Sequence, residues 1–333
     1  MTIIYHEEHA DPSFLEGKKV AVIGYGALGQ PIAFNLRDSG TDLVIGVRSP
    51  ETGAIATADG FTVGTITEAV QMAEILLLML PNEVMPPFYL EQISPHLRRG
   101  HTLIFGSAYN VTFRYIEPPP FVDVGLIAPR TMATTLREKY ENNQDFQCFV
   151  SVGQDASGNA WNTVLAVASQ MGALRGGAIE VSFEQEAELD LFAHQTLLPT
   201  MHHLLRTAAE VLLARGYPPE AVFTELYLSG ELAEYLQSAA QRGLIRTVSS
   251  TSPTHQYGTI SRIDRFSELK LERMMETTLN EIHSGDFARE WAKESNDGYR
   301  RLKNFMKQQD ALDLWELEQQ TLEFLGRGDN NET

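Results

Sequence analysis

The feature that most constrains this chain is a glycine-rich turn that joins an apolar run at residues 20–24 to an amphipathic run at residues 30–39. The first run predicts a buried strand, the second predicts a helix, and the turn has the spacing Gly-x-Gly-x-x-Gly, at Gly24, Gly26 and Gly29. The first glycine of such a turn permits a tight bend, the second admits a ligand close to the backbone, and the third lets the helix pack on the strand. The helix N-terminus then offers N–H groups to phosphates. The pattern therefore predicts a dinucleotide-binding Rossmann turn.

Short aliphatic or β-branched runs alternate with helical patterns from Lys18 to about Ser182. The strands expected in this part are residues 20–24, 42–47, 75–80, 102–105, 122–128 and 149–152. Such alternation is typical of a doubly wound parallel sheet with helices on both faces. Four later segments show helical periodicity with few β-rich runs between them: residues 183–214, 219–241, 267–284 and 287–325. We therefore expect an α/β Rossmann domain over residues 1–182, an all-helical domain over residues 183–328 and a disordered tail over residues 329–333.

Charge and cysteine content narrow the class of protein. With 44 acidic and 26 basic residues the net charge is −18, which repels nucleic acid and anionic lipid. Cys148 is the single cysteine, so no internal disulfide forms and a reducing compartment is expected. The longest apolar run is too short to cross a bilayer, and the first residues do not resemble a secretory signal. We expect a cytoplasmic protein that acts on a small molecule and has neither a nucleic-acid nor a membrane partner.

The end of the second expected strand indicates which dinucleotide is bound. Enzymes that prefer NAD usually have an Asp or Glu there, which accepts hydrogen bonds from the ribose hydroxyls. This chain has Arg48 and Ser49 instead, and a guanidinium with a hydroxyl can hold a 2′-phosphate. Thr52 can assist them. NADP(H) is therefore the expected cofactor, and the alternative is that Arg48 is only a solvated loop residue.

Several stretches in one order resemble the short, class I ketol-acid reductoisomerases, nearly from end to end. They are residues 17–26, 35–40, 80–84, 127–129, 155–158, 190–192 and 256–258. The resemblance implies a Rossmann domain followed by a knotted all-helical domain, an active site between the two, and a homodimer formed through the helical half. It also implies that the dinucleotide is lined by Gly24, Tyr25, Gly26, Ala27, Leu28, Gly29, Leu80, Pro81 and Asn82.

The resemblance further implies a two-step reaction. Members of the family isomerise a 2-aceto-2-hydroxy acid by a magnesium-assisted alkyl shift and then reduce the resulting 2-keto acid with NADPH. Two Mg²⁺ ions are held by four acidic ligands, two from each of two helices. The first pair aligns with Asp190 and His194. The second pair aligns with Glu225 and Ser229 or, with a different anchor, with Tyr227 and Glu231.

This chain departs from the family at the positions that carry the chemistry. Imidazole, phenol and alcohol groups are poor Mg²⁺ ligands, so we expect the magnesium pair to be lost, and Asp190, His194 and either Glu225 or Glu231 are the candidates for any remaining metal site. Ser107 stands where the family has its catalytic histidine. Arg130 opens a segment that replaces the family's Lys-Gly-Pro-Gly-His, and a serine-rich substrate loop ends at Ser252. Arg130 and Ser252 are therefore the expected substrate contacts.

These departures lie at the catalytic positions, whereas the glycine turn is intact. The pattern favours an NADPH-dependent reductase of a small keto or imino metabolite that lacks the alkyl shift. His194 is the leading candidate for a proton donor, because a histidine can donate near neutral pH, and Tyr227 is the alternative donor. Two other hypotheses remain open: a true reductoisomerase with an altered metal site, and a protein that binds NADP(H) without catalysis.

Overall fold

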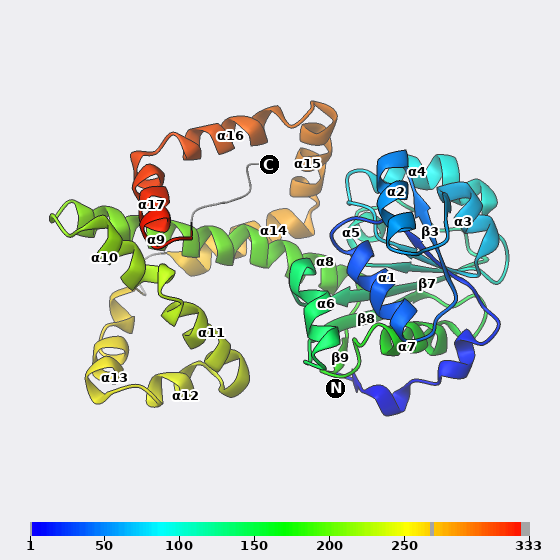
Figure 1. Ribbon diagram of the computed structural model, residues 1–333, viewed down its shortest axis with the longest axis horizontal. Helices are drawn as coiled ribbons and strands as arrows, with labels where there is room; N and C mark the ends of the chain where they lie inside the picture. The colour runs from blue at the N-terminus through cyan, green and yellow to red at the C-terminus, as the bar shows by residue number, and fades with distance from the viewer. Residues whose placement is uncertain (1, 267–269, 328–333) are drawn as a thin grey trace. The chain divides into compact units, whose positions relative to one another are not determined.

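The computed structural model describes residues 2–266 and 270–327 of the chain (Figure 1). Contacts divide the chain into two compact units, Met1–Asp190 and Leu191–Thr333. The tail that we expected at residues 329–333 lies outside the described residues, as does the beginning of the helix that we expected at residues 267–284.

The described part of the first unit is built on a nine-stranded sheet with the order β1-β9-β8-β7-β6-β5-β2-β3-β4. Its strands are β1 Ile4–Tyr5, β2 Val20–Ile23, β3 Leu43–Val47, β4 Val63–Thr65, β5 Ile75–Leu78, β6 Thr102–Phe105, β7 Asp123–Pro129, β8 Cys148–Gln154 and β9 Ala178–Glu180. The six strands that the sequence predicts are present. The other three have two or three residues each, too few for a periodic pattern to reveal.

The sheet is mostly, but not wholly, parallel. Strands β2 to β7 pair in parallel, whereas β8 runs antiparallel to β7 and β1 runs antiparallel to β9. The predicted doubly wound parallel sheet is confirmed, and these two pairings are its antiparallel exceptions. Two parallel neighbours need a connection that crosses from one end of the sheet to the other. The chain after β7 instead enters β8 at the end of the sheet where β7 stops, so β8 runs back alongside β7. There the amide of Arg130 donates to the carbonyl of Gln147 at 2.8 Å.

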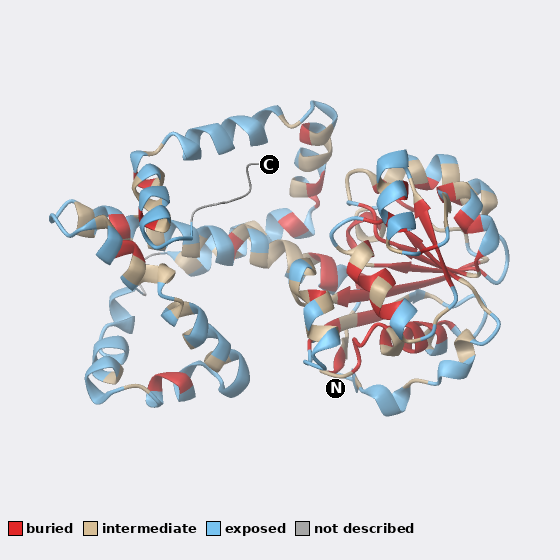
Figure 2. Ribbon diagram, viewed as in Figure 1, coloured by how far each residue is buried: buried red, intermediate tan, exposed pale blue. Residues whose placement is uncertain are grey.

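Helices cover both faces of this sheet, as the alternation predicts. Val20 and Val22 of β2 belong to one apolar cluster, which includes residues of α1 and α7. Ala21 and Ile23 point to the opposite cluster, which includes residues of α3. The helices are α1 Gly29–Asp38, α2 Pro50–Ala58, α3 Ile66–Met72, α4 Met85–Phe88, α5 Tyr109–Thr112, α6 Ala133–Glu141, α7 Ala160–Gln170 and α8 Phe183–Phe192, with shorter turns at η1 Glu7–His9, η2 Pro12–Leu15, η3 Tyr89–Ile93 and η4 Ser94–His96. Figure 2 shows the buried residues concentrated on the strands.

The described part of the second unit is entirely helical, as expected. Its helices are η5 Ala193–Leu197, α9 Leu198–Leu213, α10 Pro219–Phe223, η6 Thr224–Leu228, α11 Glu231–Arg242, α12 Leu244–Ser249, α13 Pro253–Ile260, η7 Ile263–Phe266, α14 Leu271–His283, α15 Asp286–Asn296, α16 Arg300–Asp310 and α17 Asp313–Phe324. The segment expected as one helical run at residues 287–325 is three helices, interrupted at Gly298 and near Ala311. The sequence analysis did not anticipate α12 and α13.

The described residues of the second unit bury few apolar side chains. Its apolar cluster contains four buried residues, Ala209, Val222, Phe223 and Leu314. Most of its helical surface is exposed in Figure 2. Large apolar side chains are among the exposed ones, including Leu204, Leu244, Ile245, Tyr257, Met274 and Phe324. Across the described residues, none of the helices combines the length and apolarity that a bilayer crossing requires.

Candidate dinucleotide and substrate site

The sheet order places a switch point between β2 and β5. The chain runs outward from β2 to β3 and β4, then returns to the other side of β2 and continues through β5, β6 and β7. In open α/β sheets, ligands bind outside the carboxyl ends of the strands at such a point. The turn that contains Gly24 leaves β2 there, and the segment that begins at Leu80 follows β5. The glycine turn therefore lies at the position where open α/β sheets bind their ligands.

The turn requires glycine at two of its three positions. Gly24 has φ +102°, and a Cβ there would lie 2.9 Å from the carbonyl oxygen of Met79. A Cβ on Gly29 would lie 2.0 Å from the carbonyl oxygen of Gly24, closer than any side chain allows. A Cβ on Gly26 would meet nothing within 4 Å, and this residue is exposed. The open approach at Gly26 and the N-terminus of α1 together fit a pyrophosphate.

Tyr25 supports the turn from inside. Its side chain is buried, its hydroxyl donates to Asp59 at 2.8 Å, and its ring packs on Phe61. Burial, with the hydrogen bond to Asp59, raises the pKa of Tyr25. Of the turn residues expected to line the dinucleotide, Ala27 is exposed and Leu28 is half-buried. Tyr25 can therefore reach a ligand in this region only through its backbone.

The end of β3 carries the residues expected to select the phosphorylated cofactor. Arg48 is exposed, and Ser49 caps α2 by accepting from the amide of Thr52 at 3.3 Å. The hydroxyls of Ser49 and Thr52 lie 3.1 Å apart. Glu51 in the same turn was not considered in the sequence analysis. Hydrogen bonds from its own backbone and from Ser49 lower the pKa of Glu51.

A buried amide joins the loops that follow β5 and β6. Asn110 is 1% exposed, and its Nδ2 donates to the carbonyl oxygen of Asn82 at 3.0 Å. Leu80 is buried and Pro81 is exposed at the start of the first loop. Ser107 in the second loop is half-buried, and its Oγ accepts from the amide of Tyr109 at 3.3 Å. Asn110 thus fixes the segment beside the glycine turn, a role that the sequence analysis missed.

Arg130 joins two carboxylates of α8. Its Nη2 lies 2.8 Å from Oε1 of Glu186, and its Nη1 lies 3.2 Å from Oδ1 of Asp190. Its Nε donates to the carbonyl oxygen of Ala128 at 3.3 Å. The guanidinium carbon stands 4.9 Å from the centre of the Phe149 ring, in cation–π contact. The structure therefore brings together Arg130 and Asp190, two residues that the sequence analysis placed in different roles.

Glu186 is the residue that sequence reasoning missed. It is fully buried, and its Oε2 accepts from the amide of Ala108 at 2.9 Å, while Oε1 binds Arg130. Burial raises the pKa of Glu186, against the opposing effects of Ala108 and Arg130. The sequence analysis left Glu186 out of the candidates. Its spacing of four from Asp190, which puts both carboxylates on one helical face, was the available signal.

His194 follows Asp190 by one helical turn along the chain. It is exposed and lies in the π-helical segment Ala193–Leu197, where the amide of Leu198 donates to the carbonyl of Ala193. Pro199 lies two residues beyond the end of this segment. Proline has no N–H for the carbonyl four residues earlier, so a widened turn relieves the conflict. The irregular turn is thus explained by a proline that a regular helix would not accommodate.

The remaining candidate site residues of the second unit differ in exposure and in their contacts. Glu225 is exposed on the π-helical segment η6, and Glu231 is exposed at the first residue of α11. Tyr227 packs against the small core and donates its hydroxyl to Glu318. Burial and this carboxylate raise the pKa of Tyr227. The hydroxyl of Ser252 caps α13, accepting from the amide of His255 at 3.3 Å.

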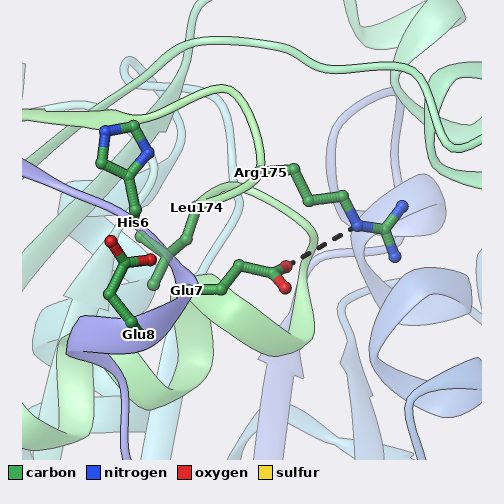
Figure 3. Close-up of a pocket in the computed structure, with 5 residues that line it drawn as sticks. All are labelled: His6, Glu7, Glu8, Leu174 and Arg175. Carbon is green, nitrogen blue, oxygen red and sulfur yellow. Dashed lines mark ion pairs between the residues drawn. The ribbon is translucent and has the colours of Figure 1, made fainter.

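A separate hollow lies at the β1–β9 edge of the first unit (Figure 3). It has a volume of about 550 Å³ and is lined by His6, Glu7, Glu8, Leu174 and Arg175. Arg175 lies 3.8 Å from Glu7 and stacks on Tyr140. Arg175 therefore makes the same kinds of contact as Arg130, an ion pair with a glutamate and a cation–π contact with an aromatic ring, but with different residues.

Known proteins are similar to both units. A profile of the acetohydroxy acid isomeroreductase NADPH-binding domain matches residues 14–177, and one of the ketol-acid reductoisomerase C-terminal domain matches residues 183–325. The ketol-acid reductoisomerase (NADP(+)) of Pyrobaculum aerophilum is 36% identical over 310 residues, which cover 92% of this chain and 94% of that protein. That of Pyrobaculum calidifontis is 35% identical over 309 residues, with the same coverage.

A solved structure agrees with these sequence matches. It is an NADH-preferring ketol-acid reductoisomerase from an uncultured archean, with a TM-score of 0.89 and 32% identity over 95% of this chain and 97% of that one. The Rossmann unit and its relatives define an NADP-dependent oxidoreductase. Both profiles and the extent of the similarity then identify the family: the chain belongs to the ketol-acid reductoisomerases.

Proposed function

We propose that this protein is an NADPH-dependent reductase of a small keto or imino compound, and that it performs hydride transfer without the alkyl shift. The observation that carries the proposal is the ion pair between Arg130 and Asp190. It engages the carboxylate that the family resemblance assigns to the metal. The glycine turn, in contrast, keeps the geometry that a dinucleotide needs.

The cofactor is held by parts of the first unit. Backbone amides of the turn from Gly24 to Gly29 bind the pyrophosphate. Arg48 supplies the charge that selects the 2′-phosphate, and the hydroxyls of Ser49 and Thr52 assist it. The segment Leu80-Pro81-Asn82, which Asn110 fixes in place, lines the nicotinamide.

The reaction is a two-electron reduction. When bound, NADPH would supply a hydride to the carbonyl carbon of the substrate; the π electrons of the C=O bond would move to oxygen, and NADP⁺ and an alkoxide would result. His194 gives the alkoxide its proton, since an imidazole is a common general acid in hydride-transfer and related reactions. Ser107 hydrogen-bonds to the substrate. Tyr227 is the weaker candidate donor, because its hydroxyl is bound to Glu318 and its pKa is raised.

A second function is supported by the extent of the family similarity. The whole chain matches family members, including the helical unit, at 36% identity over 92% of its length. A true reductoisomerase would bind a divalent ion through Asp190, His194 and either Glu225 or Glu231. It would act on 2-acetolactate, and its turnover would require the ion.

One substrate screen separates these functions. NADPH oxidation is followed with 2-acetolactate, a panel of 2-keto acids and cyclic imines, each with Mg²⁺ and with a chelator. The proposed reductase oxidises NADPH with keto acids or imines in the presence of chelator. Turnover of 2-acetolactate alone, restored by Mg²⁺, would establish the reductoisomerase. Cofactor binding without turnover of any compound would contradict both.

We also infer that the helical unit pairs with a second copy of this chain. Leu244 and Ile245 are each 65% exposed, Tyr257 is 72% exposed, and the unit's apolar cluster has only four buried residues. Obligate homodimer interfaces are rich in such side chains. The single, buried, unpaired Cys148 supports a location in the reducing cytoplasm.

A further inference from the structure

The polar cluster of Arg130, Glu186 and Asp190 differs from a divalent-ion site in its charge. A cage for Mg²⁺ presents carboxylate oxygens to a cation that enters from solvent. Here the cation is a side chain of the same unit, held by one oxygen of each carboxylate at 2.8 and 3.2 Å. Both oxygens of Glu186 are engaged, because the second accepts from the amide of Ala108. These residues do not fit a magnesium pair.

We propose, on the basis of the reductase function above, that Arg130 is the permanent cation of this site and holds the substrate oxygen on which negative charge develops. The guanidinium takes the electrostatic place of a divalent ion beside Asp190. A chelator cannot remove it, because it is covalently part of the chain. The site is therefore independent of metal.

The geometry leaves room for this role. A guanidinium has five N–H donors, and three of those on Arg130 are taken by Ala128, Glu186 and Asp190. One donor on each terminal nitrogen has no partner among the described residues. The side chain is 25% exposed, so a ligand can reach it. Two N–H groups in one plane suit a carbonyl oxygen or a carboxylate.

The position of the guanidinium is fixed, as electrostatic catalysis requires. The Phe149 ring covers one face, the buried Glu186 holds one terminal nitrogen, and the backbone of Arg130 bonds to Gln147 beside β8. Donors that are already oriented need no reorganisation when charge appears on the substrate. Arg130 thus acts in the hydride step by stabilising the negative charge that develops on the alkoxide oxygen.

Removal of this cation should create a metal site. In Arg130→Met the carboxylates of Glu186 and Asp190 lose the guanidinium, and a divalent ion can take its place. We propose to titrate the NADPH-loaded enzyme with Mn²⁺, following free Mn²⁺ by electron paramagnetic resonance. We expect no saturable binding below about 10 mM in the wild type and binding at least about tenfold tighter in Arg130→Met, as one lost positive charge at contact distance implies. Asp190→Asn added to Arg130→Met should abolish the gained site.

Arg175→Met is the matched control. Arg175 is 27% exposed, is paired with Glu7 and stacks on Tyr140, but it lies at the hollow of Figure 3. This variant should bind no more Mn²⁺ than the wild type. Arg130→Lys keeps the charge without the planar fork, so it should also gain no Mn²⁺ site. If Arg130→Met does not fold, Arg130→Gln, which also removes the charge, provides the test. Saturable Mn²⁺ binding by the wild type, or no gain in a folded Arg130→Met, would overturn the proposal.

Turnover provides a second readout with whichever compound the screen identifies. Arg130→Met should lower kcat about 100-fold, and millimolar ethylguanidinium should restore part of it, whereas Arg175→Met should leave kcat unchanged. An unchanged kcat in Arg130→Met would contradict the role of Arg130 at the substrate oxygen. If the screen finds no substrate, the proposed function fails, but the Mn²⁺ titrations still decide whether Arg130 fills the cation site.

Discussion

The two units of this chain obtain their stability in different ways. In the first unit, each face of the sheet is covered by helices, and strand residues such as Val22 and Ile23 are fully buried on opposite sides. In the second unit, twelve-residue helices such as α11 and α17 expose most of their surface, and one small cluster surrounds Phe223. The comparison teaches that the glycine turn stands on a scaffold with its own buried core, whereas the described helical unit leaves large apolar side chains exposed, which is why we propose that a second copy covers them.

The largest expected effect tests the scaffold of the first unit. Gly29→Ala places a Cβ 2.0 Å from the carbonyl oxygen of Gly24, so the turn must open. We expect NADPH affinity to fall about 1000-fold, or about 4 kcal/mol, in fluorescence titration. Gly258→Ala in the second unit, where a Cβ meets nothing within 4 Å, should leave affinity unchanged. Equal affinity in both variants would contradict the assignment of the turn.

The next effect tests how completely the first unit excludes water. His101 is 1% exposed, and burial, with a smaller contribution from Arg98, lowers its pKa from 6.5 to about 4. Between these pH values only the unfolded chain takes the proton, so the free energy of unfolding falls as pH drops from 6.5 to 4. The loss is about 3 kcal/mol. His101→Gln should remove this part of the pH dependence in urea unfolding, and an unchanged slope would show that His101 is solvated.

A third effect tests the incomplete core of the second unit. Leu244→Asp with Ile245→Asp puts two charges on its exposed apolar surface. If a second copy covers that surface, the dimer dissociation constant should rise about 50-fold, or about 2 kcal/mol, in sedimentation equilibrium. Leu90→Asp is the control, because Leu90 is also 65% exposed but lies in the first unit. Equal association of both variants would place the interface elsewhere.

The smallest effect concerns cofactor choice. Arg48→Glu replaces an exposed cation at the end of β3 by an anion. It should weaken NADPH about tenfold relative to NADH, as the loss of one charge-assisted contact does. The ratio of the two dissociation constants is the measurement. A ratio unchanged by the substitution would show that Arg48 does not contact the 2′-phosphate.

The sequence predicted those features that a local pattern encodes. The glycine turn, the six longer strands and the helical character of the second half follow from periodicity and from glycine geometry. The short strands β1, β4 and β9 escaped, because two or three residues carry no period. The direction of β8 depends on the path of the chain between Arg130 and Cys148. That path is set by tertiary contacts, which the strand propensities of single residues do not predict.

For the candidate site, too, the sequence predicted some residues but not the contacts between them. Asp190 and Arg130 were named as candidates separately, but their ion pair joins residues sixty positions apart, and no spacing rule predicts such a contact. Glu186 and Asn110 were missed because their importance comes from burial, which depends on the assembled sheet. The phenol of Tyr227 looked available in the sequence, yet packing brings it to Glu318.

The rate of NADPH oxidation by a 2-keto acid in the presence of excess EDTA is the most direct test. If the guanidinium of Arg130 supplies the positive charge at the substrate oxygen, this rate should equal the rate measured with added Mg²⁺. Oxidation that stops in EDTA and returns with Mg²⁺ would contradict the account.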